Sequence, residues 1–486
     1  MKVLLTRPAY SPLYQLFTSK TKYKSVDFPL GITYVAAALE RDGHQVEVID
    51  GEADNLTPSE LVKRIEVSKP DIVGAGATTV DFDDANLILR EAKERFNVIT
   101  VLGGPHATVL SDQVLRENPH IDYLVRGEGE ITTRELLKQL EQKGNLSQVE
   151  GISYREEAKI IHNADRPLIP DLNENCVPAR HLVDPSKYLL PLPGKGIRRV
   201  TAIQALRGCP FRCVYCYRMF GSRVRLRDPV LVVDEIEDCI NNYGVEYVNL
   251  VDDTFMVNAK RVIELCEEII KRKLKFSWQC FTRADTLEED LLRIMKEAGC
   301  KQISIGVESG NQEILDKAGK GTNLGQYVRA YALLEKVGFE KRGSFILGLP
   351  YENSKTLRDT VDFAKKLKLD RAFFNICTPY PGTQLFQMAE RGEGLHLITK
   401  SWKEFKRWGN AVIELEDLSR DNLIEWQKIA TMEFYARPRI IFHHIKAFIG
   451  GEHDKFFYRP LFFGLKEFYN RKIRSFLGNL VNEGRV

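Results

Sequence analysis

The sequence lacks any run of about eighteen apolar residues, the length that a membrane-spanning helix needs. It also lacks a cationic leader with an apolar run and a small-residue cleavage site, since Met1 leads directly into the strand-like Val3–Leu5. A large excess of one charge is missing too, because 70 Lys and Arg stand against 67 Asp and Glu, a formal net charge of +3. These absences disfavour a secreted protein and one built to neutralise a long polyanion. We therefore expect a cytoplasmic protein with no nucleic-acid partner.

A regular framework of paired cysteines is also absent. The chain has nine cysteines, an odd count, and most stand singly within helix-like or strand-like runs. This usage is typical of a reducing compartment. The 486 residues, of which 43% are hydrophobic, suffice for about three domains at roughly 150 residues each.

Five short apolar runs alternate with helix-period segments in the first 145 residues. They are Val3–Leu5, Val46–Ile49, Ile72–Ala75, Ile99–Leu102 and Tyr123–Val125. The alternation predicts a doubly wound parallel sheet in a domain over residues 1–150.

Small or turn-forming residues follow each of these runs, at the edge where an open parallel sheet binds its ligand. The segments are Thr6–Pro8, Asp50–Gly51, Gly76–Thr79, Gly103–His106 and Gly127–Glu130. Glycines that merely end strands are the alternative for any single loop, but five loops at one edge favour a site. The Gly-x-Gly-x-x-Gly fingerprint is missing after the first run, so a nicotinamide or flavin dinucleotide is not the expected ligand.

Three cysteines lie within eight positions, as Cys209, Cys213 and Cys216. Thiolates are soft ligands for zinc, copper or iron–sulfur clusters. The following residues provide no fourth Cys or His at the spacing of a structural zinc, although a distant fourth ligand would complete such a site. On a four-iron cluster, three ligands leave one iron open to bind a substrate or cofactor.

A second series of strand-like runs continues from the cysteines, with helical segments such as Ala259–Lys271 and Ser354–Lys366 between them. The runs are Thr201–Leu206, Tyr247–Val251, Phe276–Gln279, Gln302–Gly306, Ser344–Leu347 and Ala372–Ile376. The series predicts a partial (β/α)6 barrel over residues 197–400, with its chemistry at the carboxyl ends of the strands. Those ends carry Asp252, Asp253, Arg283 and Glu308, although helix capping is a serious alternative for the two aspartates.

The cysteine spacing, with Tyr215 before the last cysteine, resembles the cluster motif of radical S-adenosylmethionine enzymes. The resemblance implies that the three thiolates hold a 4Fe-4S cluster whose open iron binds the amino and carboxylate groups of S-adenosylmethionine. Reductive cleavage would then release a 5'-deoxyadenosyl radical. This chain has Asp252–Asp253 where the family often has Gly-Gly-Glu. The implied contacts are Tyr215 at the adenine, Asp253 at the amino group, Arg283 at the carboxylate and Glu308 at the ribose.

The segment Thr378–Thr383 (Thr-Pro-Tyr-Pro-Gly-Thr) resembles a signature of the family branch with an amino-terminal cobalamin-binding domain, and the first domain is similar to that domain. The Asp-x-His-x-x-Gly motif, through which many cobalamin proteins supply an axial histidine, is absent. The resemblance therefore implies cobalamin held without a protein histidine on cobalt. For His106, a turn residue with no ligand role remains the alternative. The implied cobalamin-binding residues are Thr78, Thr79, Gly103, Gly104, His106, Gly127 and Glu128.

The proline-punctuated residues 151–196 predict a linker packed across both domains. Residues 401–486 predict a mostly helical segment, in which aromatic and basic residues interleave from Phe434 onward. It could be a helical cap that seals the barrel, a helix in the headgroup region of a membrane, or a grip on single-stranded nucleic acid. Aliphatic residues such as Ile440, Ile441 and Leu461 favour peripheral membrane contact or an apolar substrate.

Together these features predict an enzyme with a 4Fe-4S cluster, S-adenosylmethionine and cobalamin that methylates an unactivated carbon of an apolar or lipid-like small molecule. A flavodoxin or ferredoxin is the expected electron donor. A cobalamin-dependent radical cyclase or rearrangement enzyme, acting on a tetrapyrrole or isoprenoid, is the second interpretation. A non-catalytic cobalamin and iron–sulfur sensor is the third, which the open cluster corner and the carboxylates Asp253 and Glu308 disfavour.

Overall fold

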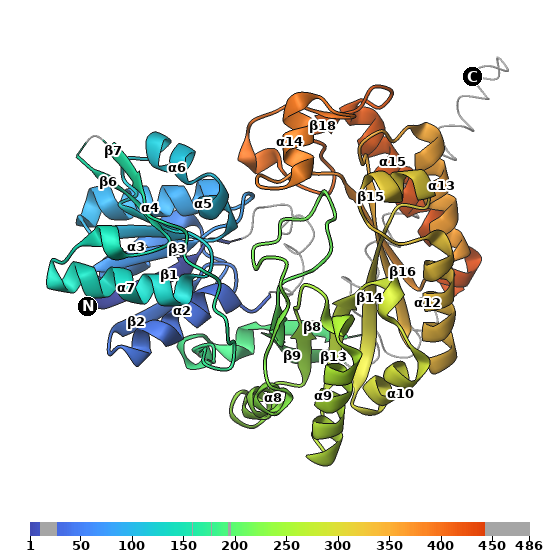
Figure 1. The fold of residues 1–486 in the computed structure, drawn as a ribbon, viewed down its shortest axis with the longest axis horizontal. Coiled ribbons are helices and arrows are strands. Elements are labelled where there is room, and N and C mark those ends of the chain that lie inside the picture. The colour runs from blue at the N-terminus through green and yellow to red at the C-terminus, as the bar shows by residue number, and fades with distance from the viewer. Residues whose placement is uncertain (10–26, 158, 176, 193–195, 443–486) are drawn as a thin grey trace, which may run out of the picture.

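Two sheets, each layered with helices, lie beside one another in the computed structural model (Figure 1), which describes residues 1–9, 27–157, 159–175, 177–192 and 196–442. The first sheet contains five parallel strands, and they are the five apolar runs that the sequence predicts. In chain order they are β1 (Lys2–Arg7), β2 (Gln45–Asp50), β3 (Ile72–Gly76), β4 (Ile99–Gly103) and β5 (Tyr123–Val125).

Helices cover both faces of this sheet, which confirms the doubly wound prediction. Leu39 and Leu136 pack with Val3 on one face, whereas Leu61 packs with Leu4 on the other. Parallel strands buried on both faces are apolar throughout, which explains the continuous runs. The first face carries α2 (Leu30–Arg41) and α7 (Gly129–Gln142); the second carries α3 (Pro58–Ser68), α4 (Phe82–Phe96), α5 (Pro105–Val109) and α6 (Ser111–Glu117).

The sheet extends beyond the predicted boundary at residue 150. Two antiparallel strands, β6 (Ile152–Glu156) and β7 (Lys159–His162), continue it after β5, and the full order is β2-β1-β3-β4-β5-β6-β7. The predicted linker over 151–196 is therefore wrong in its first part. Ile152 and Tyr154 are buried and complete the core beside β5, but strands this short within a proline-punctuated stretch give little signal in the sequence.

The second sheet is the predicted partial barrel, with the order β16-β15-β14-β13-β12-β9-β8. Its six parallel strands are β9 (Gly196–Ile203), β12 (Tyr247–Leu250), β13 (Ser277–Thr282), β14 (Cys300–Glu308), β15 (Glu340–Leu347) and β16 (Arg371–Ile376). The short strand β8 (Leu189–Leu192) joins β9 in antiparallel pairing. Within the described residues β16 pairs only with β15, so the barrel is open on that side.

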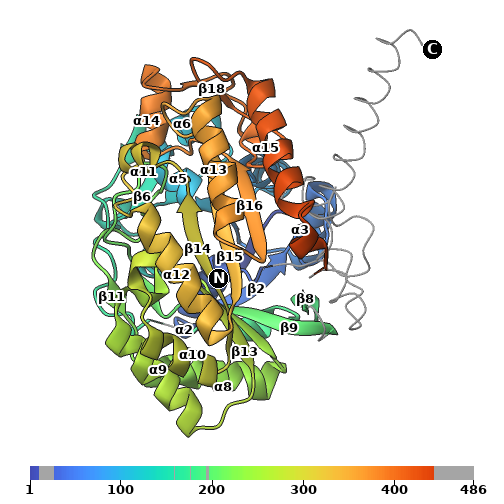
Figure 2. The same cartoon turned by 90° about the vertical axis from the view of Figure 1, so that its right-hand side faces the viewer.

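Helices cover the outer face of the barrel, as the view in Figure 2 shows. They are α8 (Pro229–Tyr243), α9 (Ala259–Lys271), α10 (Glu289–Glu297), α11 (Gln312–Lys317), α12 (Leu324–Val337) and α13 (Ser354–Lys366). Helices α9 and α13 have the predicted bounds. The side chains of Asn258 and Asn353 cap them by accepting hydrogen bonds from backbone N–H groups of the first turn.

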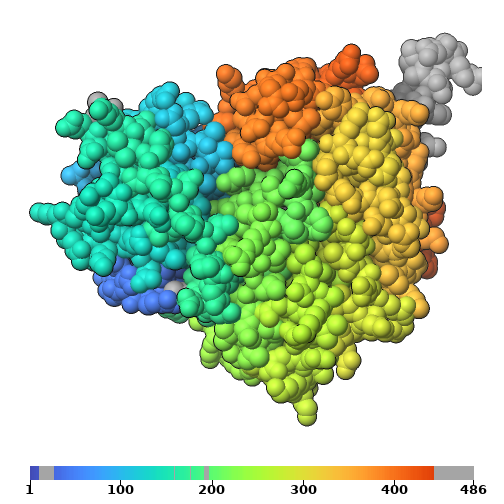
Figure 3. All heavy atoms as spheres, in the orientation of Figure 1, coloured from blue at the N-terminus to red at the C-terminus, as the bar shows by residue number. Residues whose placement is uncertain are grey.

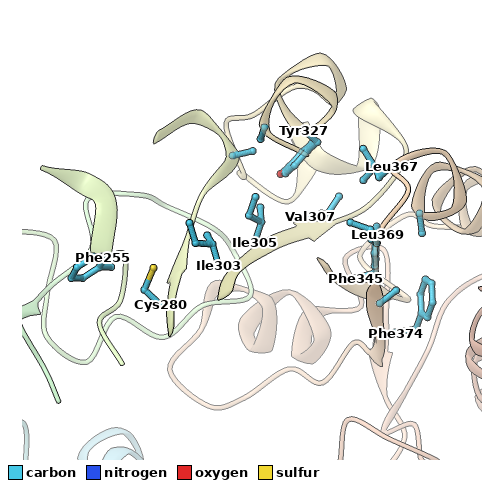
Figure 4. Close-up of a cluster of buried hydrophobic side chains, with 14 of the residues drawn as sticks. Phe255, Cys280, Ile303, Ile305, Val307, Tyr327, Phe345, Leu367, Leu369 and Phe374 are labelled. Atoms are coloured by element: carbon cyan, nitrogen blue, oxygen red, sulfur yellow. The ribbon is translucent and has the colours of Figure 1, made fainter. Parts of the chain in front are cut away.

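Alternate strand residues form the core between the sheet and these helices. Cys280, Ile303, Ile305 and Phe345 lie in this cluster (Figure 4). Burial of one such large apolar side chain stabilises the fold by about 1.5–3 kcal/mol. The intervening residues face the barrel interior and are less buried.

The carboxyl-terminal region crosses from the barrel toward the first domain. It contains α14 (Gln384–Arg391), the paired strands β17 (His396–Leu397) and β18 (Ile413–Glu414), and α15 (Arg420–Tyr435). Helix α15 packs against β16 and α13. In the described part of the chain, none of the helices combines the length and apolar character that crossing a membrane requires.

The first residues of the predicted basic and aromatic segment belong to the core. Phe434, Tyr435 and Ile440 are almost fully buried, and the Tyr435 hydroxyl donates to the Ala372 carbonyl oxygen (3.1 Å). Here the cap interpretation is the one that the structure supports, and the membrane interpretation is wrong for these three residues. Residues 443–486, which carry the rest of that prediction, lie outside the described residues.

The first domain is in direct contact with the rest of the chain (Figure 3). Arg7 Nε and the Tyr188 hydroxyl both donate to the Asp50 carboxylate, each at 2.8 Å. Val80, in the loop after β3, lies in the same hydrophobic cluster as the barrel core. The carboxyl edge of the first sheet therefore faces the second domain.

Candidate active site

The cysteine-bearing loop, residues 208–224, is closed at its base by two short strands. These strands are β10 (Leu206–Arg207) and β11 (Arg225–Leu226), which pair Arg207 with Arg225. Gly208 has a φ of +98°, and a Cβ there would lie 2.2 Å from the Arg223 carbonyl oxygen. Only glycine fits this close approach.

Distant elements hold the middle of the loop. The Val214 N–H donates to the Ala318 carbonyl oxygen (3.0 Å) after α11, and the Val214 carbonyl oxygen accepts from the Leu385 N–H (2.8 Å) in α14. A Cβ on Gly382 would lie 2.7 Å from Val109 of the first domain and 3.0 Å from the Tyr217 ring. The Thr378–Thr383 segment thus meets the cysteine loop and the first domain at one point.

The three thiols lie near one another at the barrel end. Burial raises the pKa of the Cys209 thiol, and the nearby Asp253 and Cys213 raise it further. Within the part of the chain that the structure describes, no group of three Cys, His, Asp or Glu side chains is arranged to hold a single metal ion. A cluster that offers each thiolate its own iron atom does not require convergence on one point.

The two adjacent carboxylates of Asp252 and Asp253 have different surroundings. Asp252 Oδ1 accepts the backbone N–H groups of Ala205 and Leu206, both at 2.7 Å, and is buried. Burial raises the pKa of Asp252 to about 7. Asp253 is exposed and accepts the Gly208 N–H (3.0 Å), which places its carboxylate beside the cysteines.

Arg283 directly follows β13 and has one guanidinium nitrogen without a hydrogen-bond partner among the described residues. Its guanidinium binds Asp285 through two hydrogen bonds (3.0 and 2.9 Å) and lies 3.6 Å from the centre of the Phe211 ring in the cysteine loop. Its Nη1 is buried and has no hydrogen-bond partner among the described residues. An unpaired guanidinium nitrogen fits a carboxylate ligand.

Glu308 forms a buried ion pair that the sequence did not predict. The Lys320 ammonium donates to Glu308 Oε1 (3.0 Å), and Lys320 lies 6.0 Å from the centre of the Tyr215 ring. Burial lowers the pKa of Lys320, but Glu308 outweighs it and the pKa is raised. Glu308 has a φ of +68°, an unusual conformation for glutamate that is typical of functional sites. The available signal was Gly319-Lys320-Gly321, whose glycines both have positive φ.

Glu352 is a second buried carboxylate that sequence reasoning missed. It accepts the N–H groups of Gly348 (2.7 Å) and Leu349 (3.0 Å), the loop that follows β15. Burial raises the pKa of Glu352 to about 8. Its position four residues after a predicted strand-end glycine was the signal.

In the first domain, the predicted cobalamin residues lie in the loops after β3, β4 and β5. Gly104 has a φ of +98°, and a Cβ there would lie 2.5 Å from the Ala77 carbonyl oxygen. The loops after β3 and β4 are therefore in contact. Thr78 is exposed and donates to Asp81 Oδ1 through its N–H and hydroxyl. Gly103 is half-buried beside it.

His106 is buried rather than presented to a ligand. Its Nδ1 lies 3.3 Å from the Thr79 hydroxyl, and its ring stacks on Phe82 (4.1 Å) and meets the edge of Trp402 (5.2 Å). Burial lowers the pKa of His106 to about 4, so the ring is neutral at pH 7. The structure therefore favours the alternative without a ligand role.

The Glu128 side chain is not available to cobalamin, contrary to the prediction. Its two carboxylate oxygens accept hydrogen bonds from Arg207, Arg225 and the Ile169 N–H, at 2.7–3.0 Å. Arg207, which the sequence places beside the thiols, pairs with the first domain. The sequence could not reveal a contact between residues 79 positions apart.

A cleft of about 570 Å³ lies between the first domain and the cysteine loop. Gly127 opens onto it, since no atom lies within 4 Å of the position of a Cβ there. The Tyr217 side chain, next to Cys216, forms part of the wall on the other side. The residues that line the cleft are Thr108, Ser111, Arg126, Gly127, His162, Asn163, Asp165, Arg166 and Tyr217.

Comparisons with known proteins agree with this architecture. The family model described as "Radical SAM superfamily" matches residues 203–364, and the one described as "B12 binding domain" matches residues 20–137. A protein of Pyrococcus horikoshii described as an uncharacterized methyltransferase is 35% identical over 96% of this chain and 99% of its own length.

Two further relatives differ in activity. The anaerobic magnesium-protoporphyrin IX monomethyl ester cyclase of Cereibacter sphaeroides is 32% identical over 86% of this chain and 68% of its own. The solved structure of the radical S-adenosylmethionine methyltransferase TsrM from Kitasatospora setae, with cobalamin and a [4Fe-4S] cluster bound, matches with a TM-score of 0.68 and 19% identity over 84% of both chains. This likeness supports the fold.

Proposed function

Because this chain belongs to the radical S-adenosylmethionine superfamily, in the group that carries a B12-binding domain, we propose that it methylates an unactivated carbon of an apolar small molecule. Its cofactors are a 4Fe-4S cluster, S-adenosylmethionine and cobalamin. When bound, these cofactors supply a radical that removes a hydrogen atom and a methyl group that replaces it.

The observation that carries the proposal is the set of cysteine, arginine and glutamate side chains at the end of the barrel that faces the first domain. Cys209, Cys213 and Cys216 would hold the cluster. The free Nη1 of Arg283 suits the carboxylate of S-adenosylmethionine, and Glu308, held by Lys320, suits a ribose hydroxyl. The loops after β3 to β5 would hold cobalamin, and of their predicted residues Gly127 lines the cleft.

The barrel interior supports an apolar substrate. Three large apolar side chains are exposed there: Val251 at the end of β12, Phe281 on β13 and Phe373 on β16. Their exposed fractions are 37%, 47% and 42%, respectively. Large apolar side chains left exposed inside a concave sheet are typical of a binding surface. In the proposed reaction these side chains exclude water and orient the substrate.

The decisive experiment uses S-adenosylmethionine labelled with ¹³C at its methyl group. The reconstituted enzyme is incubated anaerobically with an apolar extract of the host cells, and either dithionite or reduced flavodoxin. Methyl transfer predicts a labelled apolar product together with 5'-deoxyadenosine and S-adenosylhomocysteine. The Cys213→Ala variant should form none of these, because it loses one of three cluster ligands.

Matched variants test the substrate surface. Phe281→Asp should reduce the labelled product by at least about tenfold, because it buries a charge against an apolar substrate. Val67→Asp, at an 83% exposed position on α3, should leave it unchanged. Equal product from both variants would contradict an apolar site in the barrel.

A radical cyclase is the second candidate, favoured by the 32% identity with the cyclase of Cereibacter sphaeroides. In the same experiment a cyclase would form 5'-deoxyadenosine and a product of lower hydrogen content with no ¹³C. We also propose that residues 443–486 contact a membrane surface. Liposome flotation of the full chain and of a chain ending at residue 442 tests this, and equal flotation would exclude it.

A further inference from the structure

A buried ion cluster joins the first domain to the base of the cysteine loop. It contains Glu128 and Glu130 at the start of α7, and Arg207 and Arg225 on β10 and β11. All four side chains have exposed fractions of 3–6%. We call these four residues the domain clamp.

The contacts of the domain clamp leave little freedom to either side. Arg207 Nη1 donates to Glu128 Oε1 (2.8 Å) and its Nη2 to Glu130 Oε1 (2.7 Å), so one guanidinium bridges both carboxylates. Arg225 Nη1 lies 2.9–3.0 Å from both Glu128 oxygens. Its Nη2 also donates to the Phe220 carbonyl oxygen (3.2 Å) in the cysteine loop.

The charges of the domain clamp are balanced. Two carboxylates face two guanidinium groups, and both carboxylates lie at the positive amino-terminal end of α7. The Arg207 guanidinium also lies between the Tyr34 ring (5.1 Å) and the Phe220 ring (5.0 Å). Loss of one partner would leave a buried charge without compensation.

The domain clamp lies between the base of the cysteine loop and the cleft. Arg207 stands two residues before Cys209, and Arg225 pairs with it across the closed base of the loop. On the other side, Glu128 directly follows Gly127, which opens onto the cleft. A shift of the first domain would therefore be transmitted to the cysteines through Arg207 and Arg225.

We propose that the domain clamp sets the distance between the iron–sulfur cluster and cobalamin, so that Glu128, Glu130, Arg207 and Arg225 are positioning residues. The inference rests on the two cofactors and is independent of the proposed methyl transfer, since cyclisation would need the same spacing.

The first test uses the cofactor-free protein. Hydrogen exchange followed by mass spectrometry compares the wild type with Glu128→Gln, which keeps the shape of the side chain and removes its charge. We expect amides of residues 206–227 to exchange at least about tenfold faster in the variant. Glu433→Gln is the control, because Glu433 also accepts from two cations, Arg358 and Lys365, but lies on α15, which packs against β16 and α13. Its 206–227 segment should exchange as in the wild type.

The second test measures the spacing itself. With the cluster reduced and cobalamin as cob(II)alamin, each site carries an unpaired electron, and electron paramagnetic resonance reports their dipolar coupling. The wild type and Glu433→Gln should show one defined coupling, and Glu128→Gln a broadened or smaller one. If Glu128→Gln does not fold, the same coupling is measured in Glu130→Gln, which changes a single contact to Arg207.

Two results would overturn the proposal. One is a coupling in the folded clamp variants that equals that of the wild type, even if their melting temperature falls, because the clamp would then only stabilise the fold. The other is selective loss of cobalamin from Glu128→Gln with an unchanged exchange rate in residues 206–227, which would return Glu128 to a cofactor-binding role.

Discussion

At the scale of single residues, adjacent side chains of the same type have different tasks. The Asp252 carboxylate accepts hydrogen bonds from two backbone N–H groups, whereas Asp253 next to it remains exposed beside the cysteines. The sequence offered helix capping for both aspartates and cofactor binding for Asp253. Burial separates them, and burial of one carboxylate within a polar pair is not visible in sequence.

The Asp252→Ala and Asp253→Ala variants should therefore fail in different ways. Asp252→Ala leaves two buried N–H groups without an acceptor and should reduce the free energy of unfolding by about 2–4 kcal/mol. Asp253→Ala should leave stability nearly unchanged and weaken S-adenosylmethionine binding about tenfold. Urea denaturation and equilibrium dialysis measure the two effects. The reverse pattern, with Asp252→Ala impairing binding and Asp253→Ala impairing stability, would contradict this division of roles.

Buried carboxyl groups also predict how stability depends on pH. Burial raises the pKa of Asp81 and Asp252 to about 7 and that of Glu352 to about 8. The folded state then binds more protons than the unfolded state up to these values, so the free energy of unfolding falls as pH rises. His106, whose pKa is lowered to about 4, makes the free energy of unfolding rise with pH, but only below about pH 6.5.

Between about pH 6.5 and 8.5 the cofactor-free protein should therefore lose stability. Glu352→Gln keeps an oxygen acceptor for Gly348 and Leu349 but cannot ionise, so its loss should be smaller by on the order of 1–2 kcal/mol. Urea denaturation at both pH values measures this difference. The same slope in both proteins would show that Glu352 does not titrate in this range.

At the scale of secondary-structure elements, strands with strong apolar periodicity and helices with polar caps followed from the sequence. The bounds of α9 and α13 agree with the prediction, and in the structure an asparagine caps the first turn of each helix. Strand β6 was missed because it pairs with β5 across 27 or more positions, which leaves no local trace in the sequence. Strand β7 pairs only with β6, in a short hairpin whose few residues give little signal. Lys320 was missed for a related reason, since only the folded chain places it against Glu308.

The base of the cysteine loop offers a test at this scale. Gly208→Ala would force a Cβ to 2.2 Å from the Arg223 carbonyl oxygen, so it should distort the loop and prevent most of the iron from binding. Gly43→Ala is the control, because Gly43 also has a positive φ (+84°) but no atom within 4 Å of a Cβ. Iron per chain after anaerobic reconstitution measures the effect. Full iron in Gly208→Ala would refute the close approach.

At the scale of the whole molecule, the first domain includes β6 and β7. A fragment of residues 1–150 would expose the edge of β5 and would remove the Ile152 and Ser153 contacts of the buried Arg126. We expect this fragment to aggregate, while residues 1–172 should unfold cooperatively by circular dichroism. Cooperative unfolding of the shorter fragment would restore the domain boundary at residue 150.

The hydrogen bonds of Val214 have a consequence for how the protein matures. The cysteine loop takes its shape only when residues 318 and 385 are in place, and both emerge from the ribosome long after Cys216. Iron delivered to the nascent chain would meet three thiols without their scaffold. Cluster assembly should therefore wait until most of the polypeptide has been synthesised, which would make it a late step in biogenesis.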